Sequence, residues 1–294
     1  MAAAGEPGLP PPPHWLATLL YMPLLLAAGW LLARPLALVA PGLRADQLDL
    51  AGLVLALLLL LATLPRRIRR GWGCGDPWCR LGVTVPWRLA LSSGLRGLTV
   101  AAVLLVALTA GLLLSGQARW LGELRPAEVA NALALVPGVG FAEELLFRGW
   151  LWGELALGRW GRQALPLQAL IFALVHPWYR APGLLAPALL GGLLLLGVAL
   201  ARQRQLDHGS LWGAVGLHGG LVGGWFLVQH GLVAIRTEAP GWWVGPGQGD
   251  VNPLGGLSGW IVLAVLLAAQ RTAVARARRP STGACRASSS GARP

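Results

Sequence analysis

The chain has 294 residues, of which 55% are hydrophobic and 12% are charged, and its mean hydropathy is +0.60. A soluble domain carries roughly 25% charged residues, so this composition excludes both a soluble globular protein and a disordered chain. The net charge of +12 comes from arginine alone, since the sequence contains no lysine. The arginines lie in short connections between apolar runs, as in membrane proteins, which argues against a nucleic-acid partner. The sequence therefore predicts an all-α polytopic protein of the lipid bilayer.

Eight apolar runs follow a proline-rich lead, residues 1–14, which we expect to be disordered and which lacks the basic start of a cleaved signal peptide. Each run is near the roughly 20 residues that a helix needs to cross a bilayer. They cover residues 15–32, 50–64, 95–114, 129–152, 164–178, 184–201, 211–233 and 254–269. About eight transmembrane helices are thus predicted. The first three lie in an N-terminal region, 15–128; a non-cytoplasmic loop and the last helix occupy 234–271, and a disordered basic tail 272–294.

The positions of the arginines predict how these helices are oriented. The densest cluster, Arg66 to Arg70, follows the second run, and arginines recur in the connections 157–163 and 202–209, while the alternate connections hold fewer. Because arginine-rich connections stay on the cytoplasmic side, both termini are predicted to be cytoplasmic. The lysine-free composition, rich in Ala, Gly, Pro and Leu, indicates a GC-rich bacterial genome and hence a multi-pass protein of the bacterial inner (cell) membrane.

Two adjacent carboxylates lie in the fourth run, within the segment FAEELLFRG. A charge at bilayer depth costs at least ~2.5–3.5 kcal/mol, so it requires an explanation. Glu144 and Arg148 are four residues apart on one helical face and can form an ion pair. Glu143 points about 100° away and has no local partner. A desolvated, unpaired carboxylate suits a general base; the alternative is that Glu143 pairs with a distant arginine or histidine.

Two histidines lie inside later runs. Phe172 and His176 share a helical face, and Pro177 ends or kinks that helix after the imidazole. His218 lies among glycines, which let another helix or a substrate approach closely. Counted along the helices from one end, Glu143 and His176 lie roughly 20 Å deep and His218 roughly 13 Å. Each histidine alone fits a packed, hydrogen-bonded residue, but the agreement in depth favours a common site.

A carboxylate and two imidazoles can activate water, either directly or through a bound Zn²⁺. The candidate ligands of such a zinc ion are Glu143, His176 and His218. The sequence has no HExxH motif, which excludes the zinc-protease helix of that type. It also lacks GxSxG, so serine chemistry has little support.

The pattern Glu-Glu-x-x-x-Arg in one helix, Phe-x-x-x-His in the next and a further histidine two helices later resembles the CPBP family of intramembrane proteases. That family includes the CAAX prenyl endopeptidases and bacteriocin-processing or immunity proteins. The resemblance implies a CPBP-type protease core over residues 129–233 that acts on a membrane-associated peptide or protein. It implies that Glu143 is the base that activates water, that His176 is its partner, and that His218 stabilises the oxyanion or shares metal ligation.

The resemblance also implies that Glu144 and Arg148 orient these groups. The chain departs from the family at the third motif, which usually reads His-x-x-x-Asn or His-x-x-x-Asp, because Val222 stands four residues after His218. Members of the family are described both as metalloproteases and as glutamate-dependent enzymes, so both routes of water activation stay open.

Two other classes of protein compete with a protease. The first is a non-catalytic scaffold or immunity-type binding protein, in which the polar residues only tie helices together; Val222 favours it. The second is a transporter that relays protons through Glu and His, although the paired half-repeats of many transporters are not visible. Cys74 and Cys79 belong to a set of three cysteines, too few for a disulfide framework, and are predicted to be loop thiols.

Overall fold

The structure is a computed structural model that describes residues 13–158, 160–247 and 250–278. Its longer helices are α1 (Trp15–Ala33), α3 (Ala45–Trp72), α5 (Trp87–Leu114), α6 (Pro126–Glu144), α8 (Ala164–Val175), α9 (Leu185–Leu206), α10 (Trp212–Leu227) and α12 (Leu257–Arg278). The shorter elements are the helices α2 (Leu36–Val39), α4 (Pro77–Leu81), α7 (Trp152–Leu157) and α11 (Gly241–Val244), the π-helices η1 (Leu145–Leu151) and η4 (Val228–Leu232), the 3-10 helices η2 (Gly161–Gln163), η3 (Trp178–Arg180) and η5 (Pro253–Gly255), and the strands β1 (Ala118–Trp120) and β2 (Val233–Ile235). Most of the lead and tail predicted to be disordered, 1–14 and 272–294, lies outside the described residues.

The predicted class, an all-α polytopic membrane protein, is confirmed, but the number of long spans is smaller than the sequence predicts. A helix forms in each of the eight apolar runs, and within the described residues six helices are long and apolar enough to cross a membrane. The other two are α8, which is short, and α10, which continues as η4 to Leu232 but is not among those six. Helix α8 stops at Val175 because Pro177 disfavours helical backbone at His176, which is extended. Helix α10 changes to π-helix at Val228 and is enclosed by other helices, so its polar and glycine-rich faces are covered by protein.

Two helices are longer than the apolar runs from which they were predicted. The cluster Arg66 to Arg70 lies in the last turns of α3 and not in a connection, and the helix ends at Gly73, whose φ of 61° is left-handed. Arginines suit this position because they lie near the negative end of the helix dipole. Helix α12 likewise continues past Arg271, where the tail was predicted to begin, to Arg278.

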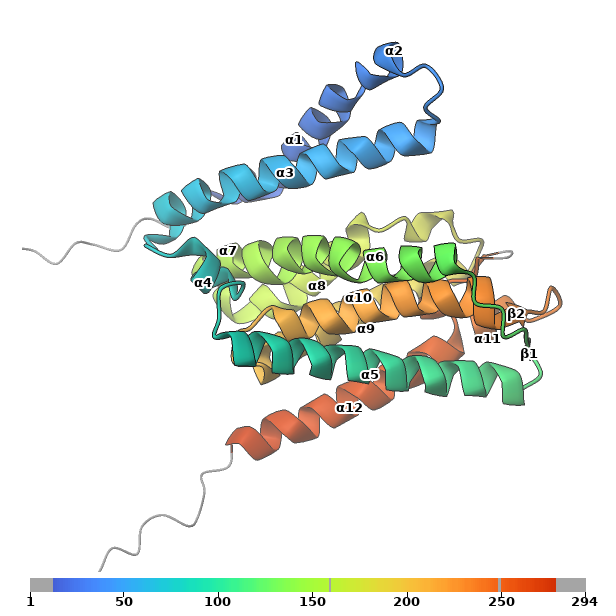
Figure 1. The fold of residues 1–294 in the computed structure, drawn as a ribbon. Coiled ribbons are helices and arrows are strands. Elements are labelled where there is room, and N and C mark those ends of the chain that lie inside the picture. Colours follow the sequence, from blue (N-terminus) through green and yellow to red (C-terminus); the bar gives the residue numbers. More distant parts are fainter. Residues whose placement is uncertain (1–12, 159, 248–249, 279–294) are drawn as a thin grey trace, which may run out of the picture.

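The helices form two unequal parts. Helices α1 and α3 pack against each other as an N-terminal hairpin, which lies beside a bundle of the remaining long helices (Figure 1). Within the hairpin the backbones touch, because a β-carbon added at Gly29 would lie 2.4 Å from the Gly52 carbonyl oxygen. Many leucines and valines on the outer faces are exposed, such as Leu24, Leu31 and Val103. Apolar side chains on an outer face are what a lipid-embedded surface requires.

Helix α10 is the centre of the bundle and packs against α5, α6 and α9. Its glycines allow this close approach: a β-carbon at Gly219 would lie 2.1 Å from the Val136 carbonyl oxygen of α6. On the opposite side, a β-carbon at Gly216 would lie 2.3 Å from the Gly94 carbonyl oxygen of α5. These approaches bring His218 of α10 against α6 at the level of its two glutamates.

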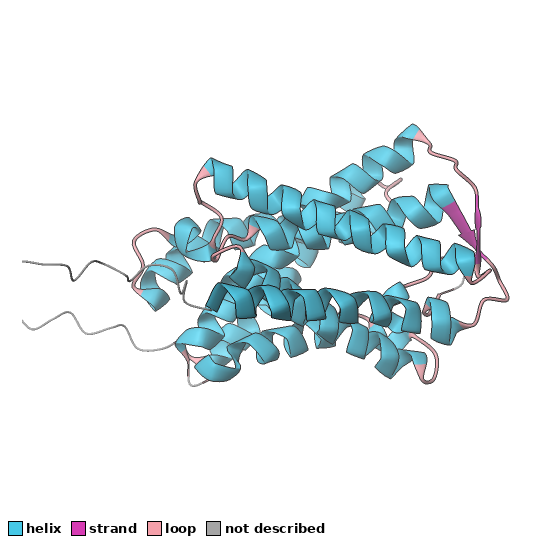
Figure 2. Ribbon diagram, turned by 90° about the horizontal axis from the view of Figure 1, so that it is seen from below, coloured by secondary structure: helices cyan, strands magenta, loops and turns pink. Residues whose placement is uncertain are grey.

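The two ends of the bundle differ. One end carries the small antiparallel sheet of β1 and β2, in which Arg119 pairs with Ala234; the sequence analysis did not predict it. Figure 2 shows these strands and several loops gathered beyond the helix ends. At the opposite end lie α4, α7, the start of α1 and the end of α12 (Figure 1). We call this second end the arginine-rich end, because the cluster of α3 lies there.

Candidate active site

The predicted pair of Glu144 and Arg148 is present and completely buried. Helix α6 passes into the π-helix η1 after Glu144, and both side chains are 0% exposed. The Arg148 Nη1 donates to Glu144 Oε1 over 2.8 Å, and its Nη2 donates to the Gly197 carbonyl of α9 over 3.3 Å. The guanidinium also lies over the Phe172 ring, 4.2 Å from its centre. The cation thus compensates the carboxylate where water is absent, as burial of an ion pair requires.

His218 is held by the same carboxylate. Its Nδ1 lies 2.8 Å from Glu144 Oε1, and because a carboxylate only accepts, Nδ1 carries the proton. Its Nε2 is then free to accept a proton, and this atom lies 3.8 Å from Glu143 Oε2. Val222, which stands where the family has Asn or Asp, lines an apolar cavity beside His218. Glu144 therefore orients this imidazole without a polar residue at position 222.

His176 presents the same nitrogen to Glu143 from the other side. It is the first residue after α8, and its Nδ1 donates to the Phe172 carbonyl over 2.6 Å. Its Nε2 lies 3.5 Å from Glu143 Oε2. The Phe172 ring packs against both imidazoles, with centre-to-centre distances of 4.5 Å to His176 and 5.9 Å to His218.

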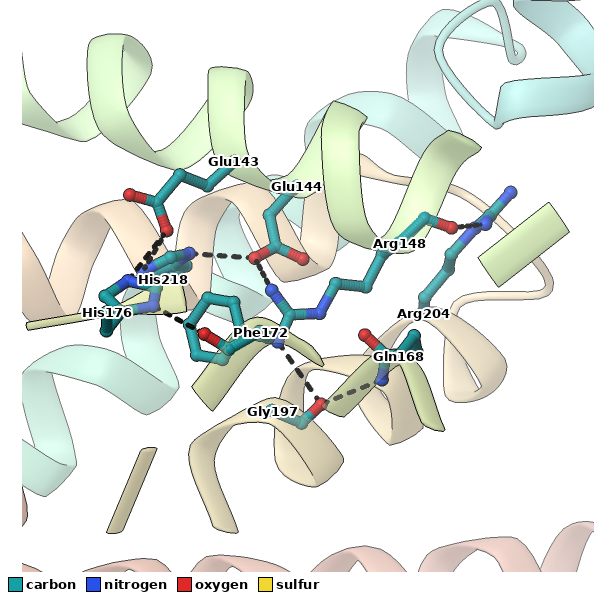
Figure 3. Close-up of polar contacts among 9 residues, drawn as sticks. All are labelled: Glu143, Glu144, Arg148, Gln168, Phe172, His176, Gly197, Arg204 and His218. Carbon is teal, nitrogen blue, oxygen red and sulfur yellow. Dashed lines mark hydrogen bonds and ion pairs between the residues drawn. The ribbon is translucent and has the colours of Figure 1, made fainter. Parts of the chain in front are cut away.

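Glu143 is the point at which these groups converge (Figure 3). Its Oε2 faces both Nε2 atoms but has no partner in hydrogen-bonding geometry among the described residues, and its side chain is 30% exposed. Three atoms that accept hydrogen bonds thus point at one another, which is unfavourable unless a proton or a donor such as water lies between them. The three residues predicted to share one depth therefore do meet, and their arrangement can hold and deprotonate a water molecule.

The zinc ligands expected from the sequence fit a metal only in part. The separations of 3.5 and 3.8 Å from Glu143 Oε2 to the two Nε2 atoms suit donors that each lie about 2.0–2.2 Å from one ion. In the part of the chain that the structure describes, however, no group of three or more His, Cys, Asp or Glu side chains qualifies as a metal site. Both predicted loop thiols are free: Cys74 lies in a loop as predicted, whereas Cys79 lies within α4.

Two residues that support the site were not singled out in the sequence analysis. Arg204, in the last turn of α9, donates through Nη1 to the Arg148 carbonyl. Gln168 of α8 is 0% exposed and donates to the Gly197 carbonyl over 3.3 Å, beside Arg148 (Figure 3). Gln168 could have been found from the sequence, because it is a polar residue within an apolar run. Arg204 had none, because an arginine at a helix end is equally expected from membrane orientation.

An apolar cavity of about 410 Å³ adjoins the catalytic candidates. It begins at His218 and Val222 and extends along α10 past Trp225 to Asn252, near the end that carries the sheet. Its walls come mainly from leucines and valines of α5, α10 and α12. Such a cavity can receive apolar side chains or a lipid-like group next to the polar atoms of the site.

The fold and site together define a multi-pass membrane protein with a Glu–His site enclosed by its helices. Residues 125–223 match the family model described as type II CAAX prenyl endopeptidase Rce1-like, which confirms the resemblance: the chain carries a domain of the CPBP protease family. Residues 1–75 match a second family, a domain of unknown function designated DUF8676. No curated protein and no solved structure matches the chain.

Proposed function

We propose that this protein is an intramembrane endopeptidase that hydrolyses a peptide bond of a membrane-associated peptide or protein, with Glu143 as the base. The observation that carries the proposal is the convergence of Glu143 Oε2 with the Nε2 atoms of His176 and His218 at 3.5 and 3.8 Å. The family match supports proteolysis in general. The finer assignment rests on this geometry.

In the proposed reaction, Glu143 holds a water molecule and takes its proton as the oxygen attacks the carbonyl carbon of the peptide bond. The carbon–nitrogen bond then breaks, the proton passes from Glu143 to the leaving amine, and a carboxylic acid and an amine result. The His176 ring is fixed by its hydrogen bond to the Phe172 carbonyl. It orients the Glu143 carboxylate and the water molecule toward the peptide bond. His218, protonated on Nε2 from solvent before the attack, donates a hydrogen bond to the oxyanion and keeps that proton throughout; Glu144 stabilises the imidazolium, as a carboxylate does in a catalytic triad.

The alternative route passes through zinc held by Glu143, His176 and His218. A zinc ion would supply a Lewis acid and a bound water of lowered pKa. Because these residues do not qualify as a metal site as they stand, we derive no step through the ion and leave the comparison to the chelator experiment below.

The arrangement of the helices supports the proposed orientation. Helix α1 begins and α12 ends at the arginine-rich end (Figure 1), so the first and the last described helix have their outer ends at the same end of the bundle. Because arginine-rich ends stay in the cytoplasm, we infer that both termini are cytoplasmic, in the inner membrane of a bacterium. The apolar cavity beside His218 then extends toward the opposite side of the membrane.

The experiment compares purified wild type, Glu143→Gln and a control, Glu128→Gln, which changes another carboxylate of α6 far from the site. Each is incubated with a library of membrane peptides, with and without a chelator, and products are identified by mass spectrometry. We expect Glu143→Gln to lose cleavage by at least about a hundredfold and Glu128→Gln to retain it. Cleavage by Glu143→Gln at the wild-type rate would refute the mechanism; loss of cleavage with chelator would assign the zinc route.

A non-catalytic scaffold gives a different result in a second measurement. If Glu143 and His176 only tie helices together, Glu143→Gln and His176→Ala should lower the melting temperature in detergent. Polar groups held unpartnered for catalysis destabilise the fold, so their removal leaves the melting temperature equal or higher. No cleavage by wild type across the library, together with destabilised variants, would establish the scaffold.

A further inference from the structure

A second cavity, of about 760 Å³, lies at the arginine-rich end; none of Glu143, Glu144, Arg148, His176 and His218 lines it, whereas Arg204, which supports the Glu–His site, does. Its lining includes residues at or near the ends of four membrane-spanning segments: Trp72, Leu157, Leu206 and Val274. The cavity is therefore at the level where the helices leave the apolar layer, which is where phospholipid headgroups lie. It is formed between α3, α4, α7, α9 and α12.

Two arginines in this cavity carry charges that no described carboxylate neutralises. Arg80 of α4 is exposed and forms no ion pair in the described part of the chain. Asp76, four residues earlier, accepts instead from the Cys79 amide and caps α4. In Arg204 the guanidinium is occupied by backbone carbonyls alone: Nε donates to Gly209 over 3.1 Å, and Nη2 donates to the carbonyl of the residue after Arg80 over 3.0 Å.

Carbonyl dipoles satisfy the hydrogen bonds of Arg204 but do not neutralise its charge. The nearby Glu144 cannot do so fully, because Arg148 already pairs with it. The wall of the cavity thus carries a net positive charge. The guanidinium of the exposed Arg80 has a planar pair of N–H donors free, and such a pair matches the oxygens of a phosphate group. A cation beside a roomy, partly apolar cavity predicts an anionic ligand.

The remaining walls suit the part of a phospholipid next to its phosphate. The rings of Trp72 and Trp152 line the cavity, and tryptophan is enriched at the boundary between headgroups and acyl chains. Arg204 lies 5.7 Å from the centre of the Trp152 ring. The Trp72 ring packs directly against Gly153, because a β-carbon at position 153 would lie 2.1 Å from the ring.

We propose that this cavity binds the headgroup of an anionic phospholipid from the leaflet at the arginine-rich end, with Arg80 holding the phosphate and Arg204 supplying the buried positive charge. The acyl chains would run along the apolar walls of α7 and α12. Arg204 also donates to the Arg148 carbonyl, so a bound lipid would stabilise the π-helix that carries the Glu144 partner. The proposal does not depend on the protein being a protease.

The test measures lipid binding to delipidated full-length protein in detergent, by native mass spectrometry and by the shift in melting temperature. The probes are phosphatidylglycerol, phosphatidylcholine and inorganic phosphate. The variants are Arg80→Gln and a matched control, Arg88→Gln, an exposed arginine at the start of α5 that does not line the cavity. We expect phosphatidylglycerol to bind wild type and Arg88→Gln alike, and Arg80→Gln about fivefold more weakly.

Three results would overturn the proposal. If Arg80→Gln and Arg88→Gln weakened the binding of phosphatidylglycerol equally, the lipid would respond only to the overall surface charge of this end. Binding of phosphatidylcholine as tight as that of phosphatidylglycerol would mean that the positive wall does not select the ligand. Protection by inorganic phosphate equal to that by lipid would make the cavity a site for free anions.

Discussion

Within the described residues, a largely buried ion pair joins the N-terminal hairpin to the domain that carries the Glu–His site, and the free energy of that pair can be measured. Arg67 of α3 donates through Nε to Glu154 Oε1 and through Nη2 to Glu154 Oε2, both over 2.7 Å. Thr18 of α1 donates to the same Oε2 over 2.6 Å. The Arg67 guanidinium lies 4.5 Å from the centre of the Tyr21 ring and 5.5 Å from that of Trp150. Glu154 on α7 therefore receives partners from both helices of the hairpin.

The size of the effect follows from burial. The side chains of Arg67 and Glu154 are 20% and 1% exposed, so removal of either leaves the other as a largely buried, unpaired charge. Breaking a buried pair in this way costs about 3–5 kcal/mol, and the partial exposure of Arg67 favours the lower end of that range. In a chain of this size, 3 kcal/mol corresponds to a fall of roughly 5 °C in melting temperature.

The assay is a double-mutant cycle in detergent with Arg67→Gln, Glu154→Gln and the double variant, and with the exposed neighbour Arg66→Gln as a control. We expect each single change to lower the melting temperature by roughly 5 °C, the melting temperature of the double variant to fall by less than the sum, and the control to match wild type. Additive losses in the double variant would refute the reasoning, because they would show that the two side chains do not interact.

Three further outcomes are expected. Gly219→Ala places a carbon 2.1 Å from the Val136 carbonyl oxygen and should cost about 1–3 kcal/mol of stability together with cleavage activity, whereas Gly138→Ala, whose added carbon meets nothing within 4 Å, should change neither. Glu144→Gln removes the charge that orients the histidine of α10 and should lower kcat by at least about a hundredfold, with KM little changed; an unaltered kcat would contradict the assigned role. Burial raises the pKa of Asp207, which lies just after α9. Its folded-state pKa therefore exceeds its unfolded value, and stability present at low pH is lost as the pH rises from about 4; a melting profile of Asp207→Asn identical to that of wild type over this range would contradict this.

Local features of the site could be predicted because they depend on helical spacing. Glu144 and Arg148 are four residues apart, and any helix through them brings the two side chains to one face. Pro177 disfavours helical backbone at the residue before it, and His176 accordingly lies directly after the end of α8, as expected. The meeting of Glu143, His176 and His218 followed from counting residues along three helices together with the family pattern.

Contacts between distant parts of the chain could not be predicted in this way. Nothing near Val222 in the sequence indicates that Glu144 holds the His218 ring, because 74 residues separate the two partners. Arg204 could not be distinguished from an arginine that only marks membrane orientation. The same holds for Glu154, whose partners lie on α1 and α3.

The prediction of the membrane spans shows the same difference between local features and contacts over long distances in the chain. Hydropathy measures how apolar a segment is and not what surrounds it, so α8 and α10 were predicted as membrane spans in the same way as the outer helices. Helix α10 is enclosed by α5, α6 and α9, and an enclosed helix is covered by protein and not by lipid. Its composition therefore need not be as apolar as that of a helix that faces lipid.

By itself the sequence determined the class of protein, the positions of the helices, the ion pair of Glu144 and Arg148, and the family of the domain. These depend on composition, on hydropathy and on spacings within one helix, all of which act over a few residues. Only the tertiary structure decided which nitrogen of each histidine faces Glu143, which carboxylate holds His218, and where two arginines remain without a counter-charge. Those features depend on how closely α6, α8, α9 and α10 approach one another, and that approach is set by packing at glycines far apart in the chain.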